Sequence, residues 1–348
     1  TIAWYKLTRN ADYYKEGPYL SDLTFTFFKT EEDAIAAMRK GLIDSFGPLS
    51  VKYLESFDKQ KVTVFSLFTP RIFGLFFNQN SNDILKDKEV RKAIAYAIDR
   101  TALTEKAASG GAIVADYLLP FAQTASGSTG NYSFDPGNAR KILAKDGWKD
   151  GDGDGILSKK SNPKDKKETV LKLKLTTSDW PDLVNTAEII KKNLRDIGID
   201  ATIEKKSLAD LEQSVIHPRN FEILLFGQAY GFEPDPFSFW HSSQIKDPGL
   251  NITLYSNKKA DKLMEDTRRL DDPVSRNDNY EQINKILSDD LPAIPLYYQL
   301  YLYLLPSSLQ GVDLAKISLP ADRFNEINKW YLETGRVYIT AQNHGYSV

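Results

Sequence analysis

Residues 171–205, LKLKLTTSDWPDLVNTAEIIKKNLRDIGIDATIEK, contain the pattern that decides the fold. The stretch opens with leucines that alternate with lysines, the period-two pattern of a half-buried strand: Leu171, Leu173 and Leu175. Pro181 then begins a helix with one apolar face, formed by Leu183, Ala187, Ile190 and Leu194. Residues 200–205 return as a strand. Such a unit has a right-handed crossover and parallel strands, so it predicts an α/β fold with a mixed sheet.

Similar patterns extend in both directions from this unit. Downstream we expect an apolar strand at 221–226, helices at 258–270 and 273–287, and a long aromatic strand at 294–305. Upstream we expect a first β-α-β unit, with strands at 23–28 and 43–46 around a helix that Thr30 caps and Gly41 ends. The remaining upstream elements are two strands within 62–77, separated at Pro70, and helices at 87–107 and 135–143.

Composition excludes several functional classes. The 348 residues carry 45 basic and 47 acidic side chains, a net charge of −2 that gives no electrostatic case for binding nucleic acid. The absence of cysteine excludes disulfides, thiolate catalysis and cysteine-based zinc sites. No apolar run reaches the roughly 18 residues that span a bilayer, and residues 1–15 lack the apolar core of a signal peptide. Aromatic side chains make up 12% of the chain, a content that suits either a large core or the walls of a ligand site.

Catalytic motifs are missing. The three histidines, His217, His241 and His344, show no H-E-x-x-H spacing, and His241 is interpreted as structural. The chain has no G-x-S-x-G, G-x-x-x-x-G-K-[ST] or G-x-G-x-x-G pattern, which removes the usual sequence support for serine hydrolysis and nucleotide binding. The sequence therefore favours a binding protein over an enzyme.

Several stretches are similar to passages of one protein family. They are residues 10–20 (NADYYKEGPYL), Gly41-Leu42-Ile43-Asp44, Phe77-Asn78, residues 87–100 (DKEVRKAIAYAIDR), Gly147-Trp148, and Asp235-Pro236 before Phe239-Trp240. Residues 87–100 are the most specific match. From about residue 5 to about residue 335, the chain resembles the extracellular solute-binding proteins of family 5, the oligopeptide- and dipeptide-binding proteins of ABC transporters. Members carry a further segment before the point where this chain begins, so the resemblance implies the C-terminal portion of the fold.

The resemblance implies periplasmic-binding-protein-like (type II) lobes with mixed sheets and a hinge. Residues 1–68 would be part of the first lobe, 69–299 the C-terminal lobe, and 300–348 a return to the first lobe. The two crossings would fall near residues 65–72 and 297–303.

The implied function is capture of an oligopeptide, or a similar extended solute, between the lobes for an ABC importer. Partners would be the solute and the permease subunits, with no nucleic acid, and with membrane contact only through an anchor outside this chain. The protein would be a monomer that needs no cofactor, and it would be extracytoplasmic, either periplasmic or a cell-surface lipoprotein. Three alternatives remain: a receptor or sensor that kept the fold without import, a protein for a non-peptide solute such as a nickel complex, haem or sugar, and a hydrolase.

Candidate ligand-binding residues come from two places: the predicted first crossing and the run that follows it, and the segments after the expected strands, where the carboxyl ends of parallel strands face a cleft. They are Arg71, Phe73, Asn78, Trp180, Gln228, Tyr230, Phe232, Asp235, Phe237 and Trp240. Arg71 interrupts an apolar run and needs a partner, which is either a ligand carboxylate or a carboxylate of the other lobe. Trp180 is either a ligand platform or core. In peptide-binding relatives an Asp that pairs with the ligand's amino group lies where this chain has Gly231, so Glu233 or Asp235 is expected to replace it, or the ligand lacks a free amine.

A possible calcium loop begins at residue 150. Asp150, Asp152 and Asp154 occupy alternate positions, as in the first half of an EF-hand loop, and Gly155 allows the sharp turn. The twelfth position departs from the pattern, because Ser161 stands where a bidentate Glu is expected and only Asp165 offers a substitute. The alternative interpretation is a solvated acidic turn.

Overall fold

The computed structural model describes residues 3–107, 111–120, 132–160, 168–231, 235–314 and 317–332. The chain divides into two compact units, residues 1–67 with 301–348 (unit 1) and residues 68–300 (unit 2). The boundaries lie within two long strands, β3 (Val62–Phe77) and β10 (Ala293–Pro306). The assignment of these units to parts of two lobes remains a prediction.

Unit 2 is built on a six-stranded sheet in the order β4-β10-β3-β9-β7-β8. The strands not yet named are β4 (Ala112–Val114), β7 (Lys172–Ser178), β8 (Asp200–Lys206) and β9 (Ile223–Ala229). β7 runs parallel to both β8 and β9, whereas β3 runs antiparallel to β9. The sheet is therefore mixed, and the predicted α/β class and parallel β-α-β unit are confirmed.

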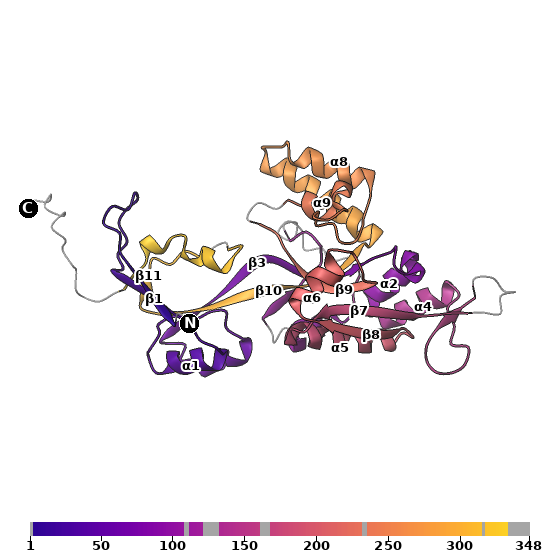
Figure 1. The fold of residues 1–348 in the computed structure, drawn as a ribbon, viewed down its shortest axis with the longest axis horizontal. Helices are drawn as coiled ribbons and strands as arrows, with labels where there is room; N and C mark the ends of the chain where they lie inside the picture. Colours follow the sequence, from indigo (N-terminus) through magenta and orange to yellow (C-terminus); the bar gives the residue numbers. More distant parts are fainter. Residues whose placement is uncertain are drawn as a thin grey trace, which may run out of the picture. The chain divides into compact units, whose positions relative to one another are not determined.

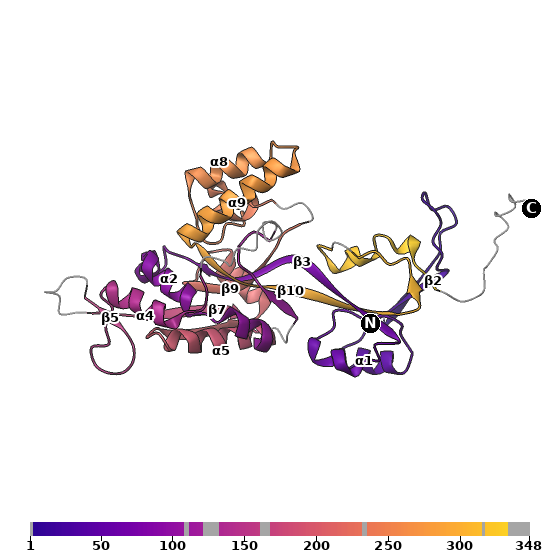
Figure 2. The same cartoon turned by 180° about the vertical axis from the view of Figure 1, so that it is seen from behind.

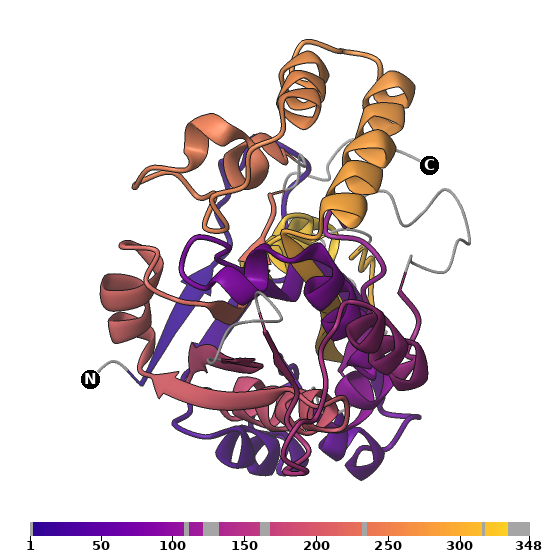
Figure 3. The same cartoon turned by 90° about the vertical axis from the view of Figure 1, so that its right-hand side faces the viewer.

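Helices cover both faces of this sheet. One face packs against α2 (Lys88–Ala97), α4 (Pro136–Lys145) and α5 (Pro181–Arg195). The other face packs against α6 (Leu208–Leu211), α7 (Phe237–Trp240), α8 (Lys258–Thr267) and α9 (Pro273–Asp290). Figures 1 and 2 show α5 on one side of the sheet and the α8–α9 pair on the other, and Figure 3 shows the orange α8–α9 pair at the top. We call these surfaces the α5 face and the α8–α9 face.

Side chains along β3 point alternately to the two faces of the sheet, so this strand contributes to both cores. Phe73, Leu75 and Phe77 lie in the core of the α5 face, and Ile72 and Phe76 lie in the core of the α8–α9 face. Both sets are 5% exposed or less, so β3 is a central strand buried on both sides.

Local signals in the sequence set most helix starts. The side chains of Thr30, Asp87 and Asp135 each accept a hydrogen bond from a backbone N–H in the first turn of the helix that follows. Gly41 has a φ of 69°, as predicted for the residue that ends α1 (Glu31–Arg39). By contrast α5 begins after Trp180, which gives no side-chain cap.

Two predictions in unit 2 are wrong in detail. β3 is one continuous strand through Pro70, because its pairing with β9 begins only at Arg71 and the Pro70 carbonyl accepts from the Tyr230 N–H. The helix expected over residues 87–107 breaks after α2, since Ile98 is extended and Asp99 caps a new short turn, α3 (Arg100–Ala102), followed by a π-helical segment to residue 107.

Unit 1 contains a two-stranded ribbon, β1 (Trp4–Thr8) with β2 (Asp22–Thr26), besides α1 and a short pair, β11 (Leu309–Gln310) with β12 (Tyr331–Leu332). The β-α-β unit predicted here is wrong, because β2 pairs antiparallel with β1. The strand expected at 43–46 is only one bridge, between Phe46 and Leu304.

A further small ribbon in unit 2 joins β5 (Ser158–Lys159) to β6 (Thr169–Val170). Among the described helices, none has the length and apolarity needed to cross a membrane.

Candidate functional site

The carboxyl ends of β7 and β9 lie together in unit 2. β7 ends at Ser178, β9 ends at Ala229, and the register of the antiparallel neighbour puts Arg71 directly opposite Ala229. We call this region the carboxyl end of the sheet, comprising Arg71, residues 178–180 and residues 228–231. Open α/β sheets commonly bind ligands at this end.

Arg71 brings an unpaired cation to the carboxyl end. It lies on the α5 face, because it alternates with Phe73 along β3. Its side chain is partly buried, yet the guanidinium makes no hydrogen bond or ion pair to any part of the chain that the structure describes. A partly buried guanidinium offers five donors in a planar fork, which suits a carboxylate or phosphate partner.

Trp180 offers an exposed aromatic surface at the same end. The ring is 53% exposed, and its residue follows β7 directly as the cap of α5. Its backbone N–H donates to the buried hydroxyl of Ser178 at 3.3 Å, which fixes the turn from strand to helix. An indole in this position is available to stack on a ligand and is not part of the core.

Gln228 presents a buried amide at this end. The residue is 5% exposed, and neither its side-chain nitrogen nor its oxygen makes a hydrogen bond to a described residue. It lies on the α8–α9 face, because it alternates with Leu224 along β9. Leaving a buried donor and acceptor unpaired costs about 1–3 kcal/mol for each group, so the site calls for a polar partner.

Tyr230 and Trp240 close the core beneath the loop that follows β9. The Trp240 indole is fully buried and donates to the Tyr230 hydroxyl at 2.9 Å. Burial raises the pKa of Tyr230 far above its ordinary value, so the phenol stays neutral. These two predicted ligand residues therefore support the carboxyl end from inside.

Asp235 and Phe237 are both held by α8 and its C-terminal cap. The Arg268 guanidinium donates to both carboxylate oxygens of Asp235 and lies 3.7 Å from the centroid of the Phe237 ring. The Phe237 ring also stacks on the His241 ring, with ring centroids 4.0 Å apart. His241 is 8% exposed, and its Nε2 lies 3.5 Å from Glu265. These contacts hold the loop against α8, and Arg268 supplies the charge that pairs with the Asp235 carboxylate.

Two other predicted residues are buried elsewhere. Phe73 lies in the core of the α5 face and stacks on Tyr297 with centroids 5.1 Å apart. Asn78 lies just past the far end of β3, where its amide donates to the Arg219 carbonyl and accepts from the Asn80 N–H. We leave Phe73, Asn78 and Trp240 out of the proposed site, because their polar groups are paired internally or they belong to the core. Phe232 and Glu233 lie outside the described residues.

The opposite end of the sheet, at the amino ends of β7 and β9, is fixed by Arg91. This side chain is 4% exposed and donates to four carbonyls: Leu85, Lys86, Asp290 and Leu291. Burial lowers the pKa of Arg91 from its ordinary value. A groove of about 480 Å³ lies beside it, lined by polar groups that include Asp290, Tyr255 and Asn257. Tyr255 and Asn257 both donate to the Asp290 carboxylate, so these groups satisfy one another. We call this region the amino end.

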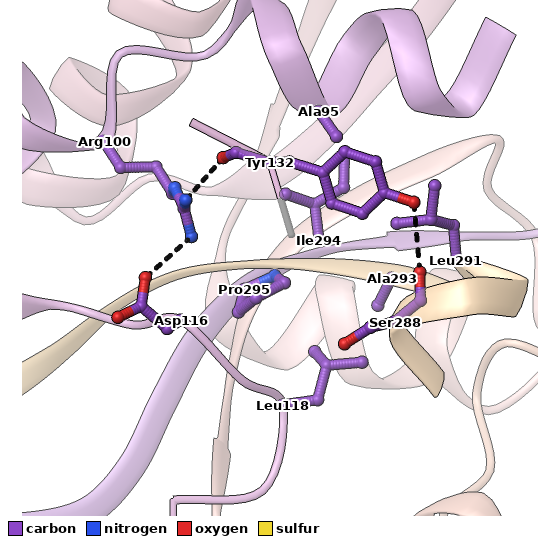
Figure 4. A pocket seen from close by; sticks show the side chains of 10 residues that line it. All are labelled: Ala95, Arg100, Asp116, Leu118, Tyr132, Ser288, Leu291, Ala293, Ile294 and Pro295. Carbon is purple, nitrogen blue, oxygen red and sulfur yellow. Dashed lines mark hydrogen bonds and ion pairs between the residues drawn. The ribbon is translucent and has the colours of Figure 1, made fainter. Parts of the chain in front are cut away.

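A small pocket surrounds the other arginine of the 87–100 stretch. Figure 4 shows Arg100 directed toward the backbone of Tyr132 and toward Asp116. The pocket has a volume of about 20 Å³, which suits roughly one water molecule and no extended solute. Burial lowers the pKa of Arg100, and it raises the pKa of Tyr132 to about 12. The contacts of this pocket therefore hold neighbouring segments together, and the pocket is not a site for an extended solute.

The acidic turn brings three carboxylates together. Oxygen atoms of Asp150, Asp152 and Asp154 lie within 4.8 Å of one another, and all three residues are exposed. Gly155 has a φ of 81°, the left-handed turn conformation predicted for it, and its N–H donates to Asp150. Ser161, Asp165 and His344 lie outside the described residues.

Sequence reasoning missed two groups that shape the carboxyl end. Arg268, which pairs with Asp235, is 33 residues away in the sequence, and no local pattern joins them. Thr176 in β7 has a buried hydroxyl with no hydrogen bond. Its one sequence signal is a polar pair, Thr176-Thr177, at the end of an apolar strand.

Residues 3–248 match the model of the bacterial extracellular solute-binding proteins, family 5 (middle region). The chain is 30% identical over 333 residues to the oligopeptide-binding protein AppA of Bacillus subtilis, covering 94% of this chain and 59% of that protein. It is 24% identical over 322 residues to the nickel-binding periplasmic protein of Escherichia coli, covering 89% of this chain and 59% of the relative.

The solved structure of B. subtilis AppA in complex with a nonapeptide superposes with a TM-score of 0.73 at 27% identity, over 95% of this chain and 64% of that one. The chain thus spans less than two thirds of the length of the relatives it matches. It belongs to the extracellular solute-binding proteins of family 5.

Proposed function

We propose that this member of the family-5 solute-binding proteins captures oligopeptides, or similar extended solutes, for an ABC importer. It would act outside the cytoplasm as a monomer that delivers the solute to the permease subunits, without catalysis. The carboxyl end of the unit-2 sheet would form one wall of the binding site.

One observation carries this proposal: three different groups suited to a ligand, none of them paired with a described residue, lie at one end of one sheet. Arg71 offers a cation, Trp180 an exposed ring, and Gln228 a donor and an acceptor. Together they suit a solute that has a charged group, apolar surface and amide groups, which is the chemistry of a peptide. The oligopeptide-binding relative and its nonapeptide complex support the same substrate class.

The described histidines are held in structural contacts. His217 pairs with Asp247 at 2.6 Å at an exposed position, and His241 is stacked on Phe237. The Ser243 hydroxyl lies 2.8 Å from Nδ1 of His241 and Glu265 lies 3.5 Å from Nε2, but the same Nδ1 accepts from the Ser243 backbone N–H, so the imidazole caps the short helix at Ser242–Gln244. A ring nitrogen engaged as a helix cap is a poor general base for the serine, which supports binding without turnover.

The first test is to purify the protein at its full natural length and to identify by mass spectrometry the material it releases on denaturation. A mixture of short peptides is the expected result. A single metal chelate, haem or sugar would replace the substrate class. An empty protein whose melting temperature ignores a peptide pool would contradict capture and favour a receptor role.

We also propose that the acidic turn at Asp150, Asp152 and Asp154 holds a calcium ion in a structural role. The support is the convergence of three carboxylates around a left-handed Gly155. Calcium titration by calorimetry should show one site that Asp152→Asn weakens at least about tenfold, whereas Asp271→Asn, an exposed control, has no effect. Absence of heat at millimolar calcium would establish a solvated turn.

A further inference from the structure

The charges at the carboxyl end are not balanced equally. Arg71 is partly buried and has no partner among the described residues. Asp179, which follows β7, also makes no hydrogen bond or ion pair with its side chain, but it is exposed to solvent. Both groups reach solvent, since no nitrogen of Arg71 is among the buried unpaired atoms of the described residues. The guanidinium is the more shielded of the two, so a counter-charge from a ligand is worth more to Arg71 than to Asp179.

The described residues of the loop after β9 do not supply a counter-charge to Arg71. The Asp235 carboxylate is held by a bidentate contact with Arg268, whose Nε lies 3.1 Å from one oxygen. Gly231 has no side chain, and Tyr230 is buried and uncharged. Among the described residues of this loop, no free carboxylate is available either to pair with Arg71 or to receive an ammonium group.

We propose that Arg71 binds the carboxylate group of the solute, and that the described part of the loop after β9 does not select for a free amine. This inference rests on the proposed function and names the chemical end by which the solute is held. A planar guanidinium accepts the two oxygens of a carboxylate side by side, and the charge-assisted pair is stronger than a neutral hydrogen bond. The solutes selected are then those with a free carboxylate, including chains whose amino end is blocked.

The experiment uses the full-length protein and a mixed-sequence nonapeptide pool prepared in three forms: free termini, an acetylated amino end, and a carboxamide at the carboxyl end. We expect acetylation to change the half-saturating concentration less than about threefold, and the carboxamide to raise it about 10- to 100-fold, as loss of a charge-assisted contact does. The Arg71→Gln variant should bind the free and carboxamide pools equally weakly. Arg71→Lys should recover part of the difference, since it keeps the charge without the fork.

Arg276→Gln on α9 is the matched control, because it removes the same charge from a residue that does not belong to the carboxyl end as defined above. It should bind all three forms as the wild type does. If the carboxamide binds as well as the free acid, or if Arg71→Gln weakens both pools by the same factor, Arg71 pairs with a carboxylate of the protein and the inference is wrong. If no form of the pool binds to the wild type, the proposed peptide function itself is contradicted.

Discussion

At the amino end of the unit-2 sheet, the Arg91 guanidinium donates to four backbone carbonyls, whereas at the carboxyl end the Arg71 guanidinium has no described partner. Two buried amides differ in the same way. Asn78 donates and accepts at the amino end, and Gln228 does neither at the carboxyl end. The two ends share one sheet and the same two cores, so the difference does not come from poor packing.

The contrast distinguishes residues that hold the fold together from residues that we propose for ligand binding. Residues 87–100 are the most specific match to the family, yet Arg91 and Arg100 both bond to backbone carbonyls and hold helices and loops together. The groups that we propose for ligand binding lie at the carboxyl end. Under the proposed function, the stretch that best matches the family holds the fold together, and the carboxyl end would determine the choice of solute.

The largest expected effect is at Arg91. Arg91→Met leaves four carbonyls without their donor, and we expect the free energy of unfolding to fall by about 3–4 kcal/mol in urea titrations. The neighbouring control, Lys92→Met, removes only a surface pair with Glu89 and should cost less than about 1 kcal/mol. Equal effects of the two variants would remove the structural role assigned to Arg91.

The next largest effect is at Asn78. Asn78→Leu removes a buried amide that is fully engaged, leaving the Arg219 carbonyl unpaired. A loss of about 2 kcal/mol in unfolding free energy is expected, with peptide affinity of the folded protein unchanged. A selective loss of affinity with normal stability would return Asn78 to the binding site.

The opposite sign is expected at Gln228. Gln228→Met removes an amide that has no partner and keeps a similar volume, so the ligand-free protein should gain about 1 kcal/mol. Peptide affinity should fall at the same time, as measured by calorimetry. A stability loss comparable with that of Asn78→Leu would mean that the two ends do not differ.

Alkaline pH provides a test of the core beneath Arg71. Burial raises the pKa of Tyr297 to about 12, above the value in the unfolded chain. The phenol's contribution to stability is complete below pH of about 10 and is lost as pH rises toward 12, because the unfolded chain ionises first. In Tyr297→Phe, the stability lost between pH 9 and pH 11 should be smaller by about 1 kcal/mol, whereas Tyr14→Phe, at an 81% exposed position, should keep the wild-type profile.

The smallest effect on stability is expected at Trp180. Its ring is 53% exposed, so Trp180→Ala should change the unfolding free energy by no more than about 0.5 kcal/mol while it weakens peptide binding. Val274→Ala, which truncates another exposed apolar residue, should alter neither quantity. A stability loss above about 2 kcal/mol would identify Trp180 as core instead of ligand platform.

The fold was predictable where the signal is local. Each of these signals depends only on residues a few positions away in the chain. They are the leucine alternation in β7, the aspartate caps of α2 and α4, and the left-handed Gly41. The errors occurred where distant partners decide. Continuity of β3 through Pro70 depends on Tyr230, and residues 43–46 lack a strand partner beyond one bridge to Leu304.

The rule for parallel strands predicted that Trp180 and Gln228 lie at strand ends, and the structure places both at the carboxyl end of the sheet. Arg71 was expected at the first crossing between the lobes, and the binding role of all three residues stays a prediction. The sequence contains no information on which polar groups find partners. Arg268 neutralises Asp235 across 33 residues, and Asn78 meets Arg219 across 141 residues.

The position of β10 has a consequence for how the molecule forms. β10 lies between β4 and β3, so the strand nearest the end of unit 2 is inserted between two strands that precede it in the chain. Until residues 290–306 emerge, β3 has an uncovered flank and Arg91 lacks two of its four acceptors, at Asp290 and Leu291. A growing chain therefore cannot finish this unit piecemeal, and contacts across some 200 residues make folding slow. An exported protein with this topology would remain unfolded, and so competent for translocation, until nearly all of unit 2 had been synthesised.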